Sequence, residues 1–331
     1  MFQSAARLAA RKVASAATRP AAATSSSPIT AAAAAPHPRP AMSTNMYIAA
    51  AAVVAAGAYG VYLRSQPPVR ADDGSAKFFG GFPPLKSLRL HSAELINHNT
   101  KRLRFELPDK DAVSGLSLTS ATLTVSFPNG SWVPVPRPYT PVSDLNQKGY
   151  VEYLIKHYPD GKGSTAMHNL KPGEHVYFMP IPGYKWSRNK HTHVAMVAGG
   201  AGITPMYQLA RHVLADPADS TRLTLVWGVN EDRDLFLADE FDRLAAEHPG
   251  RFRAVYVVSK PGSAGKHKAG YVTGDLLREA GVVPPGGEKA AAGDTKVLVC
   301  GPPAMEKALT KGADGGVLGA LGFAKGQIHQ F

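Results

Sequence analysis

The spacing of apolar residues changes in character part-way along the chain. Between residues 82 and 182, short runs alternate apolar and polar residues, and glycine and proline turns separate them. Alternation places every second side chain on the same face of a strand, so it is typical of strands with one buried face. We therefore predict a small antiparallel β-barrel over residues 82–182. Its strands are expected in the runs 88–96, 100–107, 122–127, 149–158 and 174–181.

Beyond residue 183, continuous apolar runs alternate with helical stretches. A continuous apolar run indicates a strand buried on both faces, and strand–helix alternation with short loops predicts a parallel α/β sheet. We assign residues 194–331 to this domain and 183–193 to a linker, in which His191 and His193 are expected to be solvated. The strands are expected at 194–198, 223–227, 254–258 and 297–300, and the helices at 204–215, 236–247, 274–280 and 304–310.

The stretch Val194–Met206 joins the first of these strands to its helix through glycines. Gly199, Gly200 and Gly202 remove side chains at the turn, and Pro205 suits the first turn of a helix. Free backbone N–H groups and the positive end of the helix dipole then point at one place, which is a natural seat for a pyrophosphate. The spacing Gly-x-Gly-x-x-Pro lacks the third glycine of the familiar dinucleotide fingerprint, so an ordinary tight turn is the alternative.

The N-terminal segments differ in composition from the rest of the chain. Residues 1–40 are rich in Ala, Ser and Arg and lack acidic residues, which is typical of a mitochondrial presequence; a disordered low-complexity tail is the alternative. Residues 46–63 are uncharged and would form a helix of about 27 Å, close to the ~30 Å hydrocarbon core of a bilayer. We predict a single transmembrane anchor over 41–64, with a buried helix as the alternative, and a linker over 65–81.

Charge and cysteine content exclude several kinds of function. Lys and Arg number 37 against 25 Asp and Glu, but 7 of the 12 surplus charges lie in residues 1–71, which contain no acid. The folded part carries no basic stripe interleaved with aromatic residues, so we expect no binding of nucleic acid. The single cysteine, Cys300, excludes an internal disulfide and a cysteine-based metal cluster, and we expect no metal site.

Three further stretches carry groups suited to a flat ligand that bears phosphates. In the first, Arg137 offers a planar fork for a phosphate, Tyr139 a ring surface and Thr140 a hydroxyl, with an edge-strand turn and a surface arginine as the alternative. In the second, Gly161–Ser164 offers backbone and hydroxyl donors ahead of a helix expected from about Thr165. In the third, Cys300 ends a parallel strand, where ligands bind in such sheets; inert packing is the alternative.

Taken in order, the motifs RPYTPVS, GKGS, GGAGITPM and CGPP resemble those of the NADH–cytochrome b5 reductases. The likeness covers essentially the whole folded part, and with its N-terminal segments the chain is most similar to the fungal mitochondrial form. The resemblance implies a FAD-binding barrel followed by an NAD-binding α/β domain, in a monomeric enzyme. It also implies anchoring in the mitochondrial outer membrane, with or without a second form released into the intermembrane space.

The resemblance further implies which residues serve the two cofactors. Thr140 would reach the flavin N5 region, His98 would relay a proton behind it, and Cys300 would lie near the nicotinamide. A hydrogen-bonded histidine of the barrel core is the alternative for His98. Lys156 would contact the incoming NADH. The implied cofactor-binding residues are Arg137, Pro138, Tyr139, Thr140, Ile155, Lys156, Gly161, Lys162, Gly163, Ser164, Gly199, Gly200, Ala201, Gly202, Thr204, Pro205, Ser259, Cys300, Gly301, Pro302, Pro303 and Phe331.

An enzyme of this family takes a hydride from NADH onto FAD and passes single electrons to a haem protein such as cytochrome b5. One alternative is an NAD(P)H reductase of the same superfamily that serves a ferredoxin, a quinone or an oxygenase. Another is an inactive, membrane-tethered binding protein, against which the intact Arg137, Tyr139, Thr204 and Cys300 argue.

The chain departs from the family pattern at the end of its third parallel strand. Ser259 and Lys260 stand there, where the family usually has an acidic residue that binds the adenosine ribose. An acid at this place disfavours a 2′-phosphate, whereas these two residues do not. The preference for NADH over NADPH is therefore implied by the resemblance alone.

Overall fold

A computed structural model describes residues 71, 74–81, 83–126, 134–262, 266–284, 295–311 and 315–331. All of them belong to one compact unit. The predicted presequence (1–40) and transmembrane anchor (41–64) lie outside the described residues. Within the described part, no helix combines the length and the apolar character needed to cross a bilayer.

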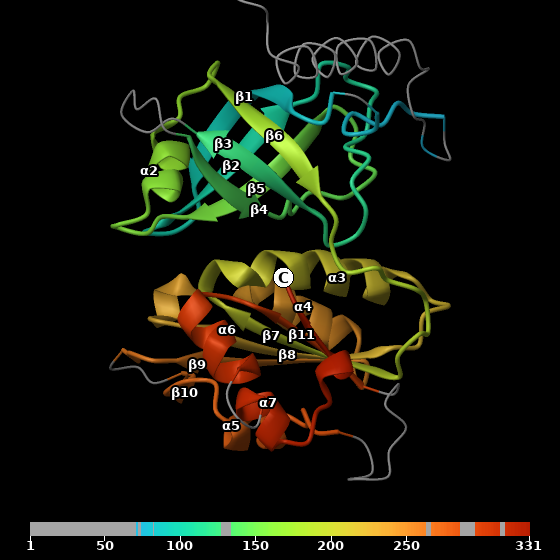
Figure 1. The fold of residues 1–331 in the computed structure, drawn as a ribbon, viewed down its shortest axis with the longest axis vertical. Coiled ribbons are helices and arrows are strands. Elements are labelled where there is room, and N and C mark those ends of the chain that lie inside the picture. Colours follow the sequence, from blue (N-terminus) through green and yellow to red (C-terminus); the bar gives the residue numbers. More distant parts are fainter. Residues whose placement is uncertain are drawn as a thin grey trace, which may run out of the picture. The chain divides into compact units, whose positions relative to one another are not determined.

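The first domain is a six-stranded sheet in which all neighbouring strands pair antiparallel (Figure 1). The order of its strands across the sheet is β4-β3-β6-β1-β2-β5. This confirms the predicted antiparallel sheet, but β4 and β5 are its two edges, so the described strands form a half-barrel and not a closed barrel. The strands are β1 (Lys86–Leu95), β2 (Thr100–Glu106), β3 (Ala121–Ser126), β4 (Val135–Tyr139), β5 (Tyr150–Lys156) and β6 (His175–Ile181), and the helix α2 (Lys162–Asn169) follows β5.

The core of this domain is aromatic. Phe105, Tyr153 and Phe178 are fully buried, and the ring centroids of Phe105 and Phe178 are 4.9 Å apart in an edge-to-face arrangement. Phe79 also packs into this core with 7% of its surface exposed, and Lys77 forms a bridge with Val113. The domain therefore begins before residue 82, and the end of the segment predicted as a linker (65–81) already belongs to it.

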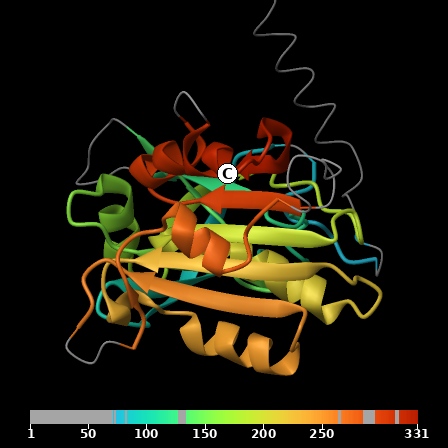
Figure 2. The same ribbon diagram turned by 90° about the horizontal axis from the view of Figure 1, so that it is seen from below.

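The second domain is built on a six-stranded parallel sheet, as the apolar runs predict. Its strands lie in the order β10-β9-β8-β7-β11-β12 and run side by side in Figure 2. They are β7 (His193–Gly199), β8 (Arg222–Val229), β9 (Phe252–Val258), β10 (Lys268–Ala269), β11 (Thr295–Cys300) and β12 (Ile328–Gln330). The helices are α3 (Ile203–Ala215), α4 (Ala238–Glu247), α5 (Gly274–Glu279), α6 (Pro303–Thr310) and α7 (Gly316–Ala320), with 3₁₀ turns at Gly200–Gly202, Asp232–Asp234 and Lys325–Gln327.

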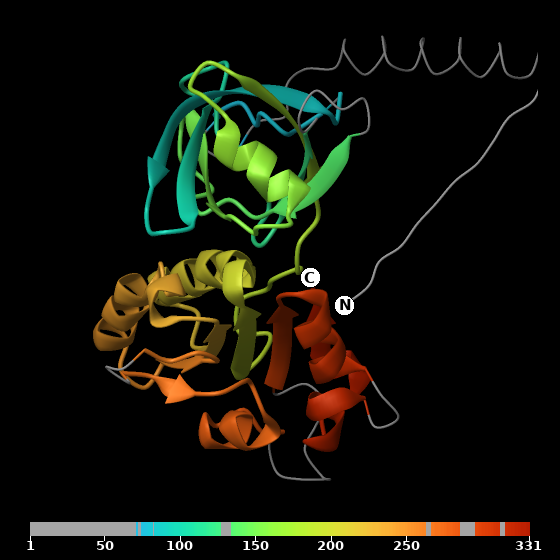
Figure 3. The same ribbon diagram turned by 90° about the vertical axis from the view of Figure 1, so that its left-hand side faces the viewer.

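Helices cover both faces of the parallel sheet (Figure 3). One face packs against α3 and α4 around Trp227 and Phe241, which are both fully buried. The other face packs against α5, α6 and α7 through Leu277, Leu309 and Leu318. Burial on both sides explains why the strands read as continuous apolar runs, because neither face of the sheet meets water.

The expectation that His191 and His193 are solvated is wrong. His191 is buried, and its Nε2 lies 2.7 Å from the hydroxyl oxygen of Tyr184. His193 begins β7, and its Nε2 lies 2.9 Å from Oγ1 of Thr224 on the next strand. Burial, aided by the charge of Arg222, lowers the pKa of His193 to about 4, so this histidine is neutral at physiological pH.

Gln208 on α3 fastens the two domains together. Its side-chain oxygen accepts a hydrogen bond from the backbone N–H of Thr119, and its Nε2 donates to the carbonyl of Pro141 at 3.1 Å. The side chain is 6% exposed, so both of its bonds are shielded from water. Pro141 directly follows Thr140, and this contact therefore fixes the RPYT segment against the second domain.

Candidate active site

The site begins at the carboxyl edge of the parallel sheet, where two turns meet. β7 and β11 are neighbours, and Ala198 pairs with Cys300 at their ends. The glycine turn Gly200–Gly202 follows β7, and the turn Gly301–Pro302 follows β11. Ligands of parallel sheets bind outside this edge, so the fold brings two of the four predicted motifs to one place.

The glycines allow these two turns to touch. A Cβ atom on Gly202 would lie 2.2 Å from the carbonyl oxygen of Cys300, and one on Gly301 would lie 3.1 Å from the backbone nitrogen of Gly199. Gly200 has a φ of +51°, which favours glycine, and its carbonyl accepts a hydrogen bond from the Trp227 indole at 2.9 Å. The glycines are therefore needed for the close backbone packing of the two turns, in addition to any role in binding a ligand.

The α3 helix starts at this edge. Thr204 lies in its first turn, 6% exposed, and its hydroxyl donates to the carbonyl of Ala201 at 3.3 Å. Pro205 occupies the same turn, as predicted. No acidic residue lies in the first turn of the helix, so its positive end is left for an external anion.

Cys300 lies at this edge as a neutral thiol. Burial raises the pKa of Cys300 to about 12, and the charge of Glu306 adds to the shift. The thiol is therefore protonated at physiological pH and does not act as a nucleophile. Phe331 follows β12, the strand next to β11, and its backbone N–H donates to the carbonyl of Val299, the residue before Cys300, at 3.1 Å. The C-terminal residue thus reaches the strand end that carries the cysteine.

On the barrel, the RPYT segment forms the edge strand β4 and its end. Arg137 is exposed, and its NH1 donates to the carbonyl of Pro136 at 2.8 Å. Tyr139 is largely buried, which raises its pKa to about 12. Thr140 is 7% exposed. An exposed cation therefore stands beside a buried ring and a buried hydroxyl, with Pro138 between them.

The GKGS segment lies against this strand. The helix α2 begins at Lys162, not near Thr165, and Gly161 is its N-cap without a side-chain cap. A Cβ atom on Gly163 would lie 2.6 Å from Cγ of Arg137, so the two predicted phosphate contacts are neighbours. The hydroxyl of Ser164 donates to the carbonyl of Gly161 at 2.9 Å, so the backbone N–H groups of the first turn, which have no partner within the helix, are the donors suited to a phosphate.

Lys156 ends β5 and meets a carboxylate of the second domain. Its Nζ lies 2.9 Å from Oδ1 of Asp234, and both side chains are nearly buried, at 7% and 4% exposed. His98, in the turn between β1 and β2, brings its Nε2 to 3.4 Å from the same oxygen. Ile155, the neighbour of Lys156, is fully buried in the barrel core, so the structure gives it a packing position.

Asp234 and Tyr158 also belong to this edge, although the predicted site residues do not include them. The hydroxyl of Tyr158 is hydrogen-bonded to the backbone of Ala201, and burial raises the pKa of this tyrosine. A Cβ atom on Gly200 would lie 3.3 Å from the same hydroxyl. Both residues follow strand ends: Tyr158 ends the stretch LIKHY after β5, and Asp234 lies in the segment after LTLVW and β8. Polar side chains just beyond strand ends were the signal that could have found them.

Ser259 directly follows β9, at the end of the third predicted parallel strand. Its hydroxyl is 3.5 Å from Oδ1 of Asn230, and the backbone N–H of Lys260 donates to the carbonyl of Asn230. The nearby Asp232 is engaged by the His267 ring at 2.7 Å and by the Gly262 N–H at 3.1 Å. The strand end therefore presents a hydroxyl and an ammonium, while the adjacent carboxylate already has partners.

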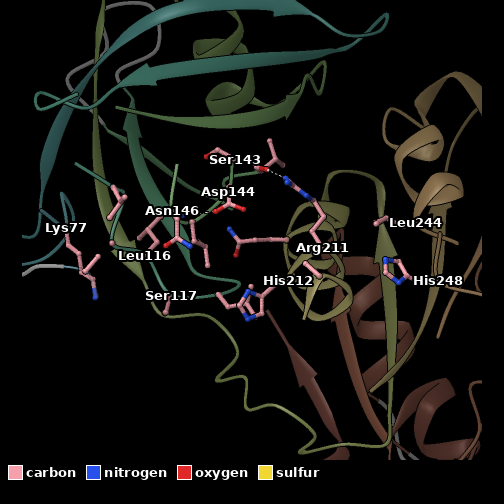
Figure 4. Close-up of a pocket in the computed structure, with 18 of the residues that line it drawn as sticks. Lys77, Leu116, Ser117, Ser143, Asp144, Asn146, Arg211, His212, Leu244 and His248 are labelled. Atoms are coloured by element: carbon pink, nitrogen blue, oxygen red, sulfur yellow. Dashed lines mark hydrogen bonds between the residues drawn. The ribbon is translucent and has the colours of Figure 1, made fainter. Parts of the chain in front are cut away.

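A cleft of about 950 Å³ opens between the barrel loops and the helices α3 and α4 (Figure 4). Ser143, Asp144 and Asn146 line it from the barrel, and Arg211 and His212 line it from α3. None of the residues assigned to FAD or NADH lines this cleft. It therefore lies apart from the site formed by the glycine turn and the RPYT segment.

Comparison with known proteins agrees with this geometry. Residues 87–183 match the family model for an oxidoreductase FAD-binding domain, and residues 196–311 match that for an oxidoreductase NAD-binding domain. NADH-cytochrome b5 reductase 2 of Pyricularia oryzae is 46% identical over 254 residues, which cover 74% of this chain and 75% of that protein. The chain belongs to the NADH-cytochrome b5 reductase family. The reductase of Phaeosphaeria nodorum is 41% identical over 308 residues, which cover 86% of this chain and 90% of that protein.

Among solved structures, the cytochrome b5 reductase domain of Ulva prolifera nitrate reductase matches with a TM-score of 0.67 and 26% identity. The match covers 77% of this chain and 100% of that one. As a member of this reductase family, the protein is an oxidoreductase that uses FAD and NADH. The residues described above fit both cofactors, because an arginine beside a helix N-terminus suits the flavin phosphates and the glycine turn suits the nicotinamide nucleotide.

Proposed function

We propose that this enzyme transfers a hydride from NADH to FAD and passes electrons one at a time to cytochrome b5. The observation that carries the proposal is the meeting of barrel and sheet at the carboxyl edge. Lys156 contacts Asp234 there, and Tyr158 contacts the glycine turn. A flavin on the barrel and a nicotinamide on the sheet would share this edge, and hydride transfer needs that proximity. The names of the fungal relatives support cytochrome b5 as the acceptor.

The residues of this chain bind and orient, while FAD supplies the redox chemistry when bound. Arg137 and the first turn of α2 would neutralise the flavin phosphates, and Tyr139 would provide the ring against which the flavin packs. The first turn of α3 would hold the pyrophosphate of NADH, since its N-terminal N–H groups carry positive partial charge. Cys300, being a neutral thiol, would contact the nicotinamide without reacting with it.

The rival acceptors are a ferredoxin, a quinone or an oxygenase component. Steady-state assays of the full-length holoenzyme with NADH and each acceptor in turn separate them. We expect kcat/KM to be highest with cytochrome b5. A higher value with any of the other acceptors would overturn this part of the proposal, while a protein without flavin reduction by NADH would match the binding-protein alternative.

We expect the preference for NADH over NADPH, measured as the ratio of kcat/KM, to be small, because Ser259 and Lys260 do not repel the 2′-phosphate of NADPH. Replacing Ser259 with Asp should widen the ratio of kcat/KM for NADH over NADPH by about tenfold, mostly by hurting NADPH. Ser259→Asn is the matched control, since it adds similar bulk without charge. Steady-state kinetics with both coenzymes measures the ratio. An unchanged ratio in Ser259→Asp would mean that residue 259 lies away from the ribose phosphate.

We also propose that residues 1–40 direct the protein to mitochondria and that residues 41–64 anchor it in the outer membrane. The support is compositional: an acid-free, arginine-bearing leader precedes an uncharged stretch of nearly bilayer length. Tyr47, Tyr59 and Tyr62 lie near the two ends of that stretch, where interfacial aromatics belong. Comparing the mass of the protein in the membrane fraction with its mass in the intermembrane-space fraction tests for a second form. A shorter soluble form would show that part of the protein is released.

Deleting residues 41–64 should turn a carbonate-resistant membrane protein into a soluble one with unchanged reductase activity. The control is the double substitution Val53→Arg/Val54→Arg, which keeps the length but adds about 5–7 kcal/mol to the cost of insertion. Both variants should appear in the supernatant after carbonate extraction. An aggregated or inactive deletion protein would show that this segment belongs to the folded core instead.

A further inference from the structure

The carboxylate of Asp234 is contacted by polar groups from the turn between β1 and β2 and from the end of β5. Its Oδ1 lies 2.9 Å from Nζ of Lys156 and accepts a hydrogen bond from Nδ2 of Asn99 at 2.9 Å. His98 lies 3.4 Å from the same oxygen through its Nε2. Thr100, the residue after Asn99, pairs with Lys156 across β2 and β5. Two adjacent barrel residues, His98 and Asn99, and Lys156 at the neighbouring strand end thus face a single carboxylate.

The second domain holds that carboxylate rigidly. Asp234 ends the 3₁₀ turn after β8, and its Oδ2 accepts a hydrogen bond from the backbone N–H of Glu231 at 3.1 Å. The backbone N–H of Asp234 donates back to the carbonyl of Glu231 at 2.9 Å. This reciprocal capping fixes the side chain, because one oxygen is committed to its own turn while the other faces the barrel.

The pair is nearly sealed from water. Lys156 is 7% exposed and Asp234 is 4% exposed. Burial acts to raise the pKa of Asp234, but the hydrogen bonds from Lys156 and Asn99 outweigh it and hold the pKa below its usual value. The carboxylate is therefore charged at physiological pH. A buried ammonium without this partner would need another, and the long lysine side chain would move to find it.

We propose that Asp234 is a positioning residue for the reaction with NADH. Its carboxylate holds the ammonium group of Lys156, and also the imidazole of His98, at the edge where the nicotinamide nucleotide enters. This inference rests on the proposed function, together with the contact between Lys156 and NADH that the family resemblance implies. Asp234 itself touches neither cofactor in this role; it acts through the lysine. A merely structural role, in which the carboxylate only fastens the two domains, makes a different prediction.

The test separates the two half-reactions of the full-length holoenzyme. In Asp234→Asn, the rate of flavin reduction by NADH, or the affinity for NADH, should fall about 10- to 100-fold, the effect of losing a hydrogen bond to a charged group. The rate at which dithionite-reduced enzyme passes electrons to cytochrome b5 should stay unchanged. The readout is rapid-mixing absorbance of the flavin in each direction, scaled to flavin content.

Asp219→Asn is the matched control. Asp219 is 1% exposed in the same domain, where it accepts hydrogen bonds from the Trp186 indole and the Thr221 N–H. It precedes the start of β8, whereas Asp234 follows the end of that strand. This variant should lower the unfolding temperature and leave both half-reactions intact. If Asp234→Asn behaves in the same way, with lower stability and normal flavin reduction, Asp234 is structural only and the proposal is overturned.

Two further variants keep the test decisive. Asn99→Ala removes one neutral donor to Asp234 and leaves both charges in place. If Asp234→Asn fails to fold, Asn99→Ala serves instead: it should slow flavin reduction by NADH severalfold relative to the wild type and leave electron transfer to cytochrome b5 unchanged, and normal flavin reduction would overturn the proposal. In a Lys156→Met background, Asp234→Asn should add little to the loss, because the carboxylate acts through the lysine. Additive losses would overturn the proposal. Wild-type enzyme that NADH does not reduce would instead overturn the proposed function itself.

Discussion

Replacing Gly202 with alanine should abolish reduction of the flavin by NADH. The added Cβ would lie 2.2 Å from the carbonyl oxygen of Cys300 and 2.9 Å from the backbone nitrogen of Gly301. Both are backbone atoms, so neither can move aside without shifting the end of β11. We expect a loss of stability of about 3 kcal/mol, at the upper end of the cost of overpacking, together with a displaced nicotinamide site.

Urea unfolding and titration with NADH measure the two effects in Gly202→Ala. Gly326→Ala is the control, because a Cβ there meets nothing within 4 Å and its φ is not in the left-handed region. That variant should match the wild type in both measurements. Normal flavin reduction by Gly202→Ala would show that the two turns separate easily, and would contradict the close packing at this edge.

Replacing Arg137 with alanine should weaken binding of FAD about 10- to 100-fold. A charge-assisted hydrogen bond contributes about 1.5–3 kcal/mol, and Arg137 is the exposed cation beside the first turn of α2. Flavin content after extensive dialysis of the full-length protein, followed by titration with FAD, gives the affinity.

Arg89→Ala is the control for Arg137→Ala. Arg89 lies on β1 of the same sheet and is exposed, but its partner is Glu106 at 2.9 Å. Its removal costs little, as for most exposed ion pairs, and FAD content should be unchanged. Full flavin occupancy of the Arg137→Ala protein after dialysis would place the flavin phosphates elsewhere on the barrel.

The sequence alone predicts the elements whose hydrophobic pattern is long and regular. The strands around Val197, Val226 and Val257 are buried on both faces, so in an α/β domain their continuous apolar runs indicate parallel strands. β4 was not predicted as a strand, because Pro136 and Pro138 cannot donate ladder hydrogen bonds. It forms because it is an edge strand, where only one side needs partners. The short strands β10 and β12 carry too few residues for a pattern to show.

Much of the candidate site follows from local motifs, since Arg137, the Gly161–Ser164 turn and the glycine turn each stand in one short stretch. Contacts between distant stretches could not be predicted in the same way. Asp234 meets Lys156 only because β8 and β5 end at the same edge, and that juxtaposition is tertiary. The same holds for His193, whose hydrogen-bond partner Thr224 lies on the neighbouring strand, so its partial burial could not be predicted from its own stretch of sequence.

Mixing the oxygen-free, full-length holoenzyme with NADH, and then with oxidised cytochrome b5, tests the central claim most directly. The yellow flavin absorbance should bleach on mixing with NADH, and it should return as two molecules of cytochrome b5 are reduced for each flavin, since a hydride carries two electrons. A flavin that keeps its colour in NADH, or a reduced flavin that leaves cytochrome b5 oxidised, would contradict the account.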